Sequence, residues 1–189
     1  MFPRDSSRAA ASTGTLACVN LYARLFALLA RLKFRRKVDF FARTGLGFRV
    51  WPTDLDAIGH MNNAKYLALL DLGRIDLWVR SGFWDLAWNR GWYGVVSAQS
   101  IRYRRSLKPW ERFEVSTEVV GWDEKAIYYV HDFTVGDELC ARAVVQSRTL
   151  TRSGGQVTPK ELWDLVGGAP EMTLPDWVDR WAEDVRIGL

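Results

Sequence analysis

The segment Pro52–Arg74, PTDLDAIGHMNNAKYLALLDLGR, joins a cluster of polar residues directly to an apolar run. Two aspartates, a Gly-His pair and two asparagines precede the run. The apolar residues then recur at helical spacing, at Tyr66, Leu67, Leu70, Leu77 and Trp78. Apolar side chains also cover most of the remaining circumference, as in a helix that is buried on nearly all sides. The segment therefore predicts one long buried helix with a polar entrance.

The polar entrance suits the chemistry of acyl transfer. A helix start exposes backbone N–H groups and about half a positive charge, and Asn62 and Asn63 stand where they can cap it. A carbonyl placed there is polarised as it becomes an oxyanion, and one such donor contributes roughly 100- to 1,000-fold in rate. Asp54 or Asp56 can act on the same carbon, as general base or nucleophile. Spacing alone leaves open which aspartate acts, and whether the cluster is only a helix cap.

The remainder of the core region changes to a period of two after Trp92. In Phe113–Val120, for example, Phe113, Val115 and Val119 share one face while Glu114 and Glu118 share the other. Strands are predicted at 47–52, 93–107, 113–120, 126–135 and 140–151, and short helices near 158–168 and 174–188. One strand, a long buried helix and then antiparallel strands predict an α+β fold, in which a sheet wraps around the central helix.

The N-terminal segment Leu16–Lys37, LACVNLYARLFALLARLKFRRK, is amphipathic. Arg24 and Arg31 make it a poor membrane-spanning helix. The basic cluster Lys33–Lys37 follows the apolar run, which is the wrong order for a cleavable signal. Two interpretations stay open: a helix lying in a lipid interface with its basic end on anionic headgroups, or a helix packed on its own domain or on a partner subunit.

Composition narrows the class of protein. The chain has 189 residues, of which 48% are apolar and 13% aromatic, so it can build a core of one ordinary domain. The net charge of +4 is modest, and the basic run RYRR belongs to no nucleic-acid reader motif. Cys18 and Cys140 lie far apart and provide neither a disulfide framework nor metal-ligand spacing. We therefore expect a cytoplasmic protein, with membrane association through 16–37 as the alternative, and no metal.

Several segments resemble the hot-dog-fold thioesterases. These are PTDLDAIGHMNNAKY, the helical LDLGR, YRRSLKPWERFEV and GWDEKAIYYVHDFTV, which are similar to the 4-hydroxybenzoyl-CoA and acyl-ACP thioesterases. The likeness is greatest to an animal thioesterase-superfamily branch whose members carry a hydrophobic N-terminal segment. It covers about Gly47–Arg152. It implies a sheet around one helix, a homodimer or dimer of dimers joined edge to edge, and an acyl-CoA site at the dimer interface.

The resemblance also implies roles for individual residues. Asp56 matches the catalytic carboxylate, and the backbone N–H near Asn63 matches the donor to the thioester carbonyl. His60 matches a histidine of the acyl-ACP thioesterases, but Ile58 stands where their motif has asparagine, so His60 is secondary. We expect substrate contacts from Asn62, Tyr66, Ser97, Gln99, Ser100, Arg102, Arg104 and Arg105. The three arginines are candidates for the coenzyme A phosphates, or else guard a solvated strand edge.

Two other polar groups have structural interpretations. Asp71 and Arg74, three apart on the helix, are expected to pair with each other. His131 shares its strand face with Tyr129 and Phe133, which favours a histidine of the core or interface.

The sequence thus predicts a flexible stretch 1–15, an amphipathic helical segment 16–45, a hot-dog domain 46–153 and a helical extension 154–189. The expected activity is hydrolysis of acyl-CoA or acyl-ACP thioesters, without a cofactor other than the coenzyme A of the substrate. The alternatives are a non-catalytic acyl-thioester binder and a hot-dog hydratase or dehydratase. The hydratase is disfavoured because Asp56 and His60 are four apart, without the intervening Asn-Pro of the usual motif.

Overall fold

The computed structural model describes residues 21–32 and 34–186. Residues 21–32 are helical, and a short 3-10 turn, η1, spans Pro52–Asp54. The strands are β1 (Thr44–Arg49), β2 (Trp92–Tyr103), β3 (Arg112–Trp122), β4 (Ile127–Val135), β5 (Glu138–Thr151) and β6 (Gln156–Val157). The helices are α2 (Asn63–Arg80), α3 (Phe83–Asn89), α4 (Pro159–Val166) and α5 (Asp176–Asp184).

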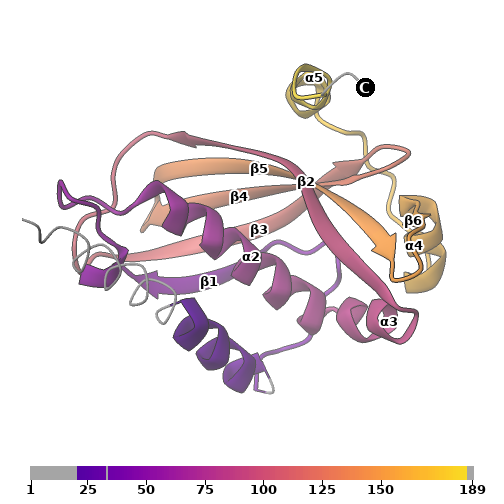
Figure 1. The fold of residues 1–189 in the computed structure, drawn as a ribbon, viewed down its shortest axis with the longest axis horizontal. Helices are drawn as coiled ribbons and strands as arrows, with labels where there is room; N and C mark the ends of the chain where they lie inside the picture. The colour runs from indigo at the N-terminus through magenta and orange to yellow at the C-terminus, as the bar shows by residue number, and fades with distance from the viewer. Residues whose placement is uncertain (1–20, 33, 187–189) are drawn as a thin grey trace, which may run out of the picture.

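The strands form one antiparallel sheet in the order β1-β3-β4-β5-β2, with β6 paired to β5. The sheet curls around α2, which crosses its inner face (Figure 1). This is the α+β arrangement that the sequence predicts. Both outer strands of the sheet come from the first half of the described chain, and each pairs with a strand that is not its neighbour in sequence, β1 with β3 and β2 with β5.

The helix α2 begins and ends where its sequence signals stand. The Asn62 side chain caps the start by accepting from the Ala64 N–H at 2.9 Å. The helix stops at Ser81, and Gly82 follows with a φ of 77° that a glycine adopts without strain. Leu69, Leu70 and Leu77 are at most 1% exposed and pack against the sheet. Burial of each such side chain contributes about 1.5–3 kcal/mol.

The outer face of the sheet is partly covered by α5. Val178 and Ala182 of α5 pack on Tyr128 and Val144, whose strand neighbours face α2 instead. The Trp181 indole N–H also donates to the Ser100 hydroxyl at 2.9 Å. Within the C-terminal extension, α5 thus packs on the side of the sheet away from the central helix, whereas Leu162 and Trp163 of α4 belong to the main core.

The helix of residues 21–32 lies beside α2 (Figure 1). Its Leu28 and Leu32 are buried in the main core. The expected boundary between 45 and 46 falls inside β1, because Thr44 and Gly45 already pair with β3. The expected stretch 1–15 lies outside the described residues. The sequence did not predict α3, because Gly82 indicated a stop and also serves as the residue from which a second short helix begins.

Candidate active site

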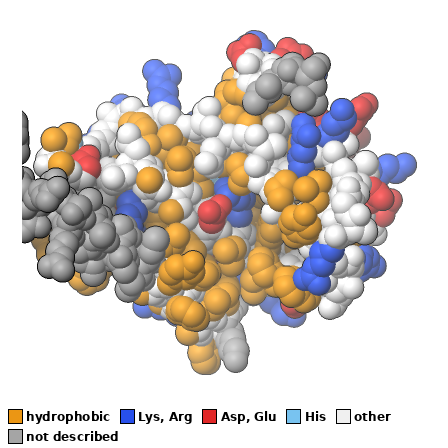
Figure 2. Space-filling view, in the orientation of Figure 1, with side chains coloured by type: hydrophobic (Ala, Val, Ile, Leu, Met, Phe, Trp, Pro, Cys, Tyr) orange, Lys and Arg blue, Asp and Glu red, His pale blue; other side chains and the backbone are white. Residues whose placement is uncertain are grey.

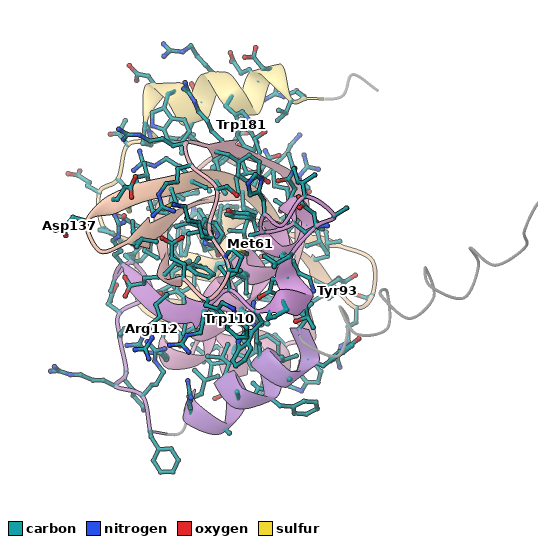
Figure 3. The ribbon with its side chains drawn as sticks, turned by 90° about the vertical axis from the view of Figure 1, so that its left-hand side faces the viewer. Met61, Tyr93, Trp110, Arg112, Asp137 and Trp181 are labelled. Carbon is teal, nitrogen blue, oxygen red and sulfur yellow. The ribbon has the colours of Figure 1, made fainter. Side chains whose placement is uncertain are left out.

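The polar entrance of α2 forms a small closed loop. Leu55 and Met61 make an isolated antiparallel bridge, and the Asn62 N–H donates to the Asp54 carbonyl at 2.8 Å. Within it, the Asp56 N–H donates to the His60 carbonyl at 2.8 Å. Met61 is 2% exposed and lies in the middle of the molecule in Figure 3. We call residues 54–62 the entrance loop: its two ends are fixed in the core, and its turn, 56–60, projects outward.

The Asp56 carboxylate is held by one oxygen and free at the other. Its Oδ1 accepts the backbone N–H groups of Ile58 and His60, both at 3.0 Å. Its Oδ2 has no hydrogen-bond partner among the described residues, and the residue is half-buried. The two bonds to Oδ1 fix the orientation of the carboxylate, so Oδ2 is an oriented acceptor at the start of the helix.

Asp54 has a different environment. It is fully buried, and its Oδ2 accepts from the Trp51 N–H at 2.8 Å and from the Arg24 guanidinium at 2.5 Å. The aspartate therefore ties the entrance loop to the helix of residues 21–32. Sequence reasoning did not find Arg24 as its partner. The sequence indicated only that Arg24 and Arg31 lie on one side of the N-terminal helix. It did not indicate which face of the domain that side of the helix contacts.

The start of α2 offers donors to a ligand. Asn63 is the first residue of the helix, is exposed, and its N–H has no partner among the described residues. Asn62 uses its side chain as the cap. His60 is exposed, and its imidazole makes no hydrogen bond to the described residues. Asp56, His60 and Asn63 thus each keep a polar group without a partner among the described residues, in the loop and the first residue of α2. Their catalytic roles stay a prediction.

Tyr66 and Gln99, two of the expected substrate contacts, both belong to the inner side of the sheet. Tyr66 is 1% exposed, and its hydroxyl accepts from the Leu107 N–H at 3.1 Å. Burial raises the pKa of Tyr66, which keeps its hydroxyl protonated. Gln99 alternates with Ile101 and Tyr103, whose ring contacts Tyr66, so Gln99 belongs to the inner face of the sheet.

Ser97 and Ser100 lie on the outer face. Ser97 occupies an irregularity in the pairing of β2 with β5, and its hydroxyl donates to the Gln146 side chain at 3.0 Å. Ser100 accepts from Trp181. The strand thus separates the two serines from Gln99, so these three residues do not form one site within a single chain.

The three arginines also separate. Arg105 forms ion pairs with Glu111 and Glu138, both at 2.9 Å, and its side-chain hydrogen bonds to these carboxylates raise its pKa. Arg102 and Arg104 are exposed and form no ion pair with the described residues. Arg102 lines a hollow with Trp177 and Trp181 on the outer face. Of the three, Arg102 and Arg104 have charges available to a ligand.

A second polar group lies inside the fold. Asp71 pairs with Arg74, as expected, and the Arg74 guanidinium lies 3.3 Å from His131 Nε2. His131 Nδ1 lies 3.0 Å from the Thr117 hydroxyl. Burial, followed by the charge of Arg74, holds the pKa of His131 well below its usual range. This confirms His131 as a satisfied core histidine. In the described part of the chain, no three His, Cys, Asp or Glu side chains cluster closely enough to hold a metal.

An antiparallel sheet curled around one long helix, entered through a short loop, defines the hot-dog thioesterase fold. Among solved structures, the YbaW probable thioesterase of Escherichia coli aligns with a TM-score of 0.61 at 20% identity, over 65% of this chain and 95% of that one. A mutant 4-hydroxybenzoyl CoA thioesterase complexed with 4-hydroxybenzoyl CoA aligns with a TM-score of 0.58 at 15% identity, over 66% of this chain and 98% of that one. These likenesses establish the fold.

The family follows from the sequence comparison. The profile of the thioesterase-like superfamily matches residues 50–181, and the chain belongs to this superfamily. Protein THEM6 of Drosophila melanogaster is 33% identical over 171 residues, covering 89% of this chain and 88% of that protein. Protein THEM6 of Xenopus laevis is 40% identical over 99 residues, which are 52% of this chain and 48% of that protein. This chain thus matches about half the length of the Xenopus relative. A probable thioesterase of Saccharomyces cerevisiae is 27% identical over 132 residues, which cover 67% of this chain and 56% of that protein.

Proposed function

We propose that the protein hydrolyses acyl-CoA or acyl-carrier-protein thioesters, with Asp56 as the catalytic carboxylate. The observation that carries the proposal is the oriented carboxylate of Asp56, whose Oδ2 has no partner among the described residues, in the loop that leads directly into the helix start at Asn63. Membership of the thioesterase-like superfamily and the similarity to a probable yeast thioesterase support the reaction class. The acyl group, the carrier and the role of each residue belong to the proposal.

The chemistry needs one acceptor for a proton and one donor for an oxyanion. With Asp56 as general base, Oδ2 takes a proton from water, and the hydroxide forms a bond to the thioester carbon. The Asn63 N–H stabilises the oxyanion at the positive end of the helix. The C–S bond then breaks, and the leaving thiolate takes the proton back. With Asp56 as nucleophile, Oδ2 bonds to the carbon directly, the thiolate leaves, and water hydrolyses the resulting anhydride.

Asp56→Asn tests this assignment without removing the loop's structure. The asparagine carbonyl can still accept from Ile58 and His60, but the variant has no carboxylate. We expect turnover to fall by roughly 100-fold or more, with an unchanged melting temperature. The assay is release of free thiol from short, long and aromatic acyl-CoAs, and His60→Asn is the comparison variant, for which a smaller loss is expected. Full activity in Asp56→Asn would move the chemistry to another residue.

A non-catalytic acyl-thioester binder is the second candidate. The observation that favours it is that Asp56 Oδ1 closes the turn 56–60, which an aspartate of purely structural role also does. Wild-type protein that binds acyl-CoA in calorimetry but releases no thiol from any substrate, including acyl-carrier protein, would establish this function instead.

We further propose that two copies pair along β2. This strand is 12 residues long, has β5 as its only neighbour in the described sheet, and exposes Tyr93, Val96 and Tyr103 by 39–43%. A long unpaired edge with exposed apolar side chains favours association with another strand. Val96→Lys should shift the mass in light scattering from dimer to monomer. A wild-type monomer at micromolar concentration would count against the pairing.

The helix of residues 21–32 supports a proposal of membrane contact. Its outward surface is almost entirely apolar, with Tyr22, Phe26 and Leu29 exposed by 60%, 68% and 44%, and Phe34 beyond it is 90% exposed. Figure 2 shows hydrophobic side chains gathered over this helix at the lower edge of the molecule. Arg31, Arg36 and Lys37 are exposed nearby, whereas Lys33 and the start of the expected segment lie outside the described residues. We propose that this surface binds anionic lipid.

No helix in the described part of the chain is long and apolar enough to cross a bilayer. The contact that we propose is peripheral, and flotation with anionic vesicles tests it. Phe26→Glu/Phe34→Glu should leave the floating fraction, while Trp177→Glu, at an exposed aromatic position on α5, should stay in it. Flotation of all three proteins to the same extent would refute this surface as the contact.

A further inference from the structure

A groove of about 770 Å³ lies between the helix of residues 21–32 and the end of the β1–β3 pair. Four arginines from three elements line it, and Phe48, Trp51 and Phe113 supply its apolar walls. The arginines are Arg24, Arg31, Arg49 and Arg112. Figure 3 shows Arg112 beside Trp110 and close to this helix, with Trp181 at the opposite end of the molecule. The groove therefore lies far from the outer-face hollow of α5.

The charges in the groove are unbalanced. Arg24 is neutralised, because its guanidinium bonds to Asp54 and to the Arg49 carbonyl. The other three guanidinium groups form no ion pair with any described residue, and Glu114 is the one carboxylate among the lining residues. The lining therefore retains an excess of two positive charges that the described residues do not neutralise.

The arginines of β1 and β3 also face each other across the sheet. Arg49 and Arg112 are directly opposite in the antiparallel register. Like charges at such positions destabilise the pair of strands, and an anion bound between them would remove the repulsion. Guanidinium groups bind phosphate oxygens in a bidentate geometry, which makes a phosphate the anion that fits.

The groove adjoins the entrance loop. Trp51 lines the groove and donates its N–H to Asp54, the first residue of that loop. Arg24 also joins the two, because it lines the groove and pairs with Asp54. Three of the arginines lie before residue 50, where the match to the superfamily profile begins. Most of the positive charge of the groove therefore comes from a part of the chain that the superfamily profile does not include.

We propose that this groove binds the phosphate groups of a phosphorylated small molecule. Resting on the proposed function, the ligand that suits a phosphate site next to the entrance loop is the nucleotide end of acyl-CoA, whose ring can stack on Trp51. The headgroup of a phospholipid offers the same phosphate chemistry from a second source. Either ligand would be held by Arg31, Arg49 and Arg112, with Arg24 fixing the groove's shape.

Calorimetry with the full chain tests the groove directly. The probes are adenosine 3′,5′-bisphosphate, glycerol 3-phosphate and adenosine without phosphate. The variant is Arg49→Gln/Arg112→Gln, and the matched control is Lys160→Gln/Arg180→Gln, which removes the same number of charges from exposed positions on α4 and α5. We expect the wild type and the control to bind the bisphosphate alike, and the groove variant to bind it at least tenfold more weakly. Adenosine should not bind.

The outcomes separate the two sources of phosphate. Selective binding of the bisphosphate supports the nucleotide, and equal or tighter binding of glycerol 3-phosphate supports the lipid headgroup. Binding of neither phosphate by the wild type, or equal weakening in the control variant, would overturn the proposal.

A kinetic comparison keeps this proposal distinct from the proposed function. The groove variant should raise the KM for acyl-CoA but not for the same acyl group on pantetheine, which has no nucleotide. Bisphosphate binding without turnover of any thioester would refute the hydrolase and leave the groove standing. Turnover with the same KM for acyl-CoA in the variant and the wild type would refute the groove as the coenzyme A site.

Discussion

The entrance loop, 54–62, and the interior polar cluster of Arg74, Thr117 and His131 both adjoin α2, and each contains one of the chain's two histidines. In the cluster, both ring nitrogens of His131 have partners and the side chain is fully buried. Because a guanidinium only donates, Nε2 must accept from Arg74, so the proton of the neutral ring resides on Nδ1 and is donated to Thr117.

In the entrance loop the corresponding groups keep free atoms. The His60 imidazole, one oxygen of Asp56 and the N–H of Asn63 have no partners among the described residues. Unpaired polar groups at a helix start are available to a ligand, whereas the satisfied interior cluster fixes α2 against the sheet. The comparison indicates that the capacity to bind a ligand depends less on the number of polar groups beside the helix than on which of their atoms remain unpaired.

The largest loss of stability is expected at Asp54, the buried end of the entrance loop. Asp54→Ala removes the partner of Arg24, whose side chain is only 12% exposed. It also removes the acceptor of the Trp51 N–H. Loss of one member of a buried pair costs about 3 kcal/mol, which urea denaturation measures. Asp56→Asn is the control and should be near wild type. Equal stabilities for the two variants would erase the distinction between the anchored and the free part of the loop.

A second substitution tests how closely the interior cluster is packed. A Cβ at Gly73 would lie 2.3 Å from the Thr117 hydroxyl oxygen, and this β-branched side chain on a buried strand cannot rotate away easily. Gly73→Ala should therefore destabilise the fold by about 1–3 kcal/mol, although alanine favours a helix by roughly 1 kcal/mol. Adding Thr117→Ala should recover part of the loss in a double-mutant cycle. A Gly73→Ala protein that is more stable than the wild type would mean that the cluster rearranges around the added methyl group at little cost in free energy.

Buried His131 should make the stability of the fold depend on pH. The low pKa of buried His131 means that, below about pH 6.5, the unfolded chain binds a proton that the folded chain does not. Stability contributed by the neutral ring is present above that pH. It is lost on acidification by up to about 1.4 kcal/mol per pH unit. Urea denaturation between pH 7 and 5 should show that the free energy of unfolding falls less steeply on acidification in His131→Gln than in the wild type. An identical slope in the two proteins would contradict a neutral His131.

The smallest effect concerns the cap at the start of α2. Asn62→Ala removes the acceptor of the Ala64 N–H and should cost about 1 kcal/mol. The neighbouring Asn63→Ala removes a side chain that makes no hydrogen bond to the described residues, and thermal denaturation should show little change. If both variants lose the same stability, the two asparagines share the capping role.

The sequence predicted the central helix and the α+β arrangement because apolar periodicity records burial. It also predicted the Asp71–Arg74 pair and the core position of His131, since both follow from spacing along a single element. Contacts between distant elements were beyond it. Two examples are the ion pair of Arg24 with Asp54 and the hydrogen bond from Trp181 of α5 to Ser100. Both depend on how segments that are far apart in the sequence pack together. Periodicity within one segment carries no information on these contacts.

The candidate site divides in the same way. The local features of Asp56, His60 and Asn63 were predictable, because the loop and the helix start are contiguous in sequence. The grouping of Ser97, Gln99 and Ser100 was not, because alternation along β2 and its irregularity at Ser97 decide which face each side chain takes. The arginines differ for a similar reason, since Arg105 meets Glu138 only after β5 has paired with its neighbours.

The sheet order has a consequence for the route by which the protein folds. The strands β3, β4 and β5 follow one another through short turns, so they can pair early, with little loss of chain entropy. Both edge strands precede them in the chain and must wait for this central meander before they find a partner. We expect β1, β2 and the entrance loop between β1 and α2 to become ordered last. During synthesis, the N-terminal half would then emerge from the ribosome before its template exists, exposing the apolar α2 sequence to chaperones.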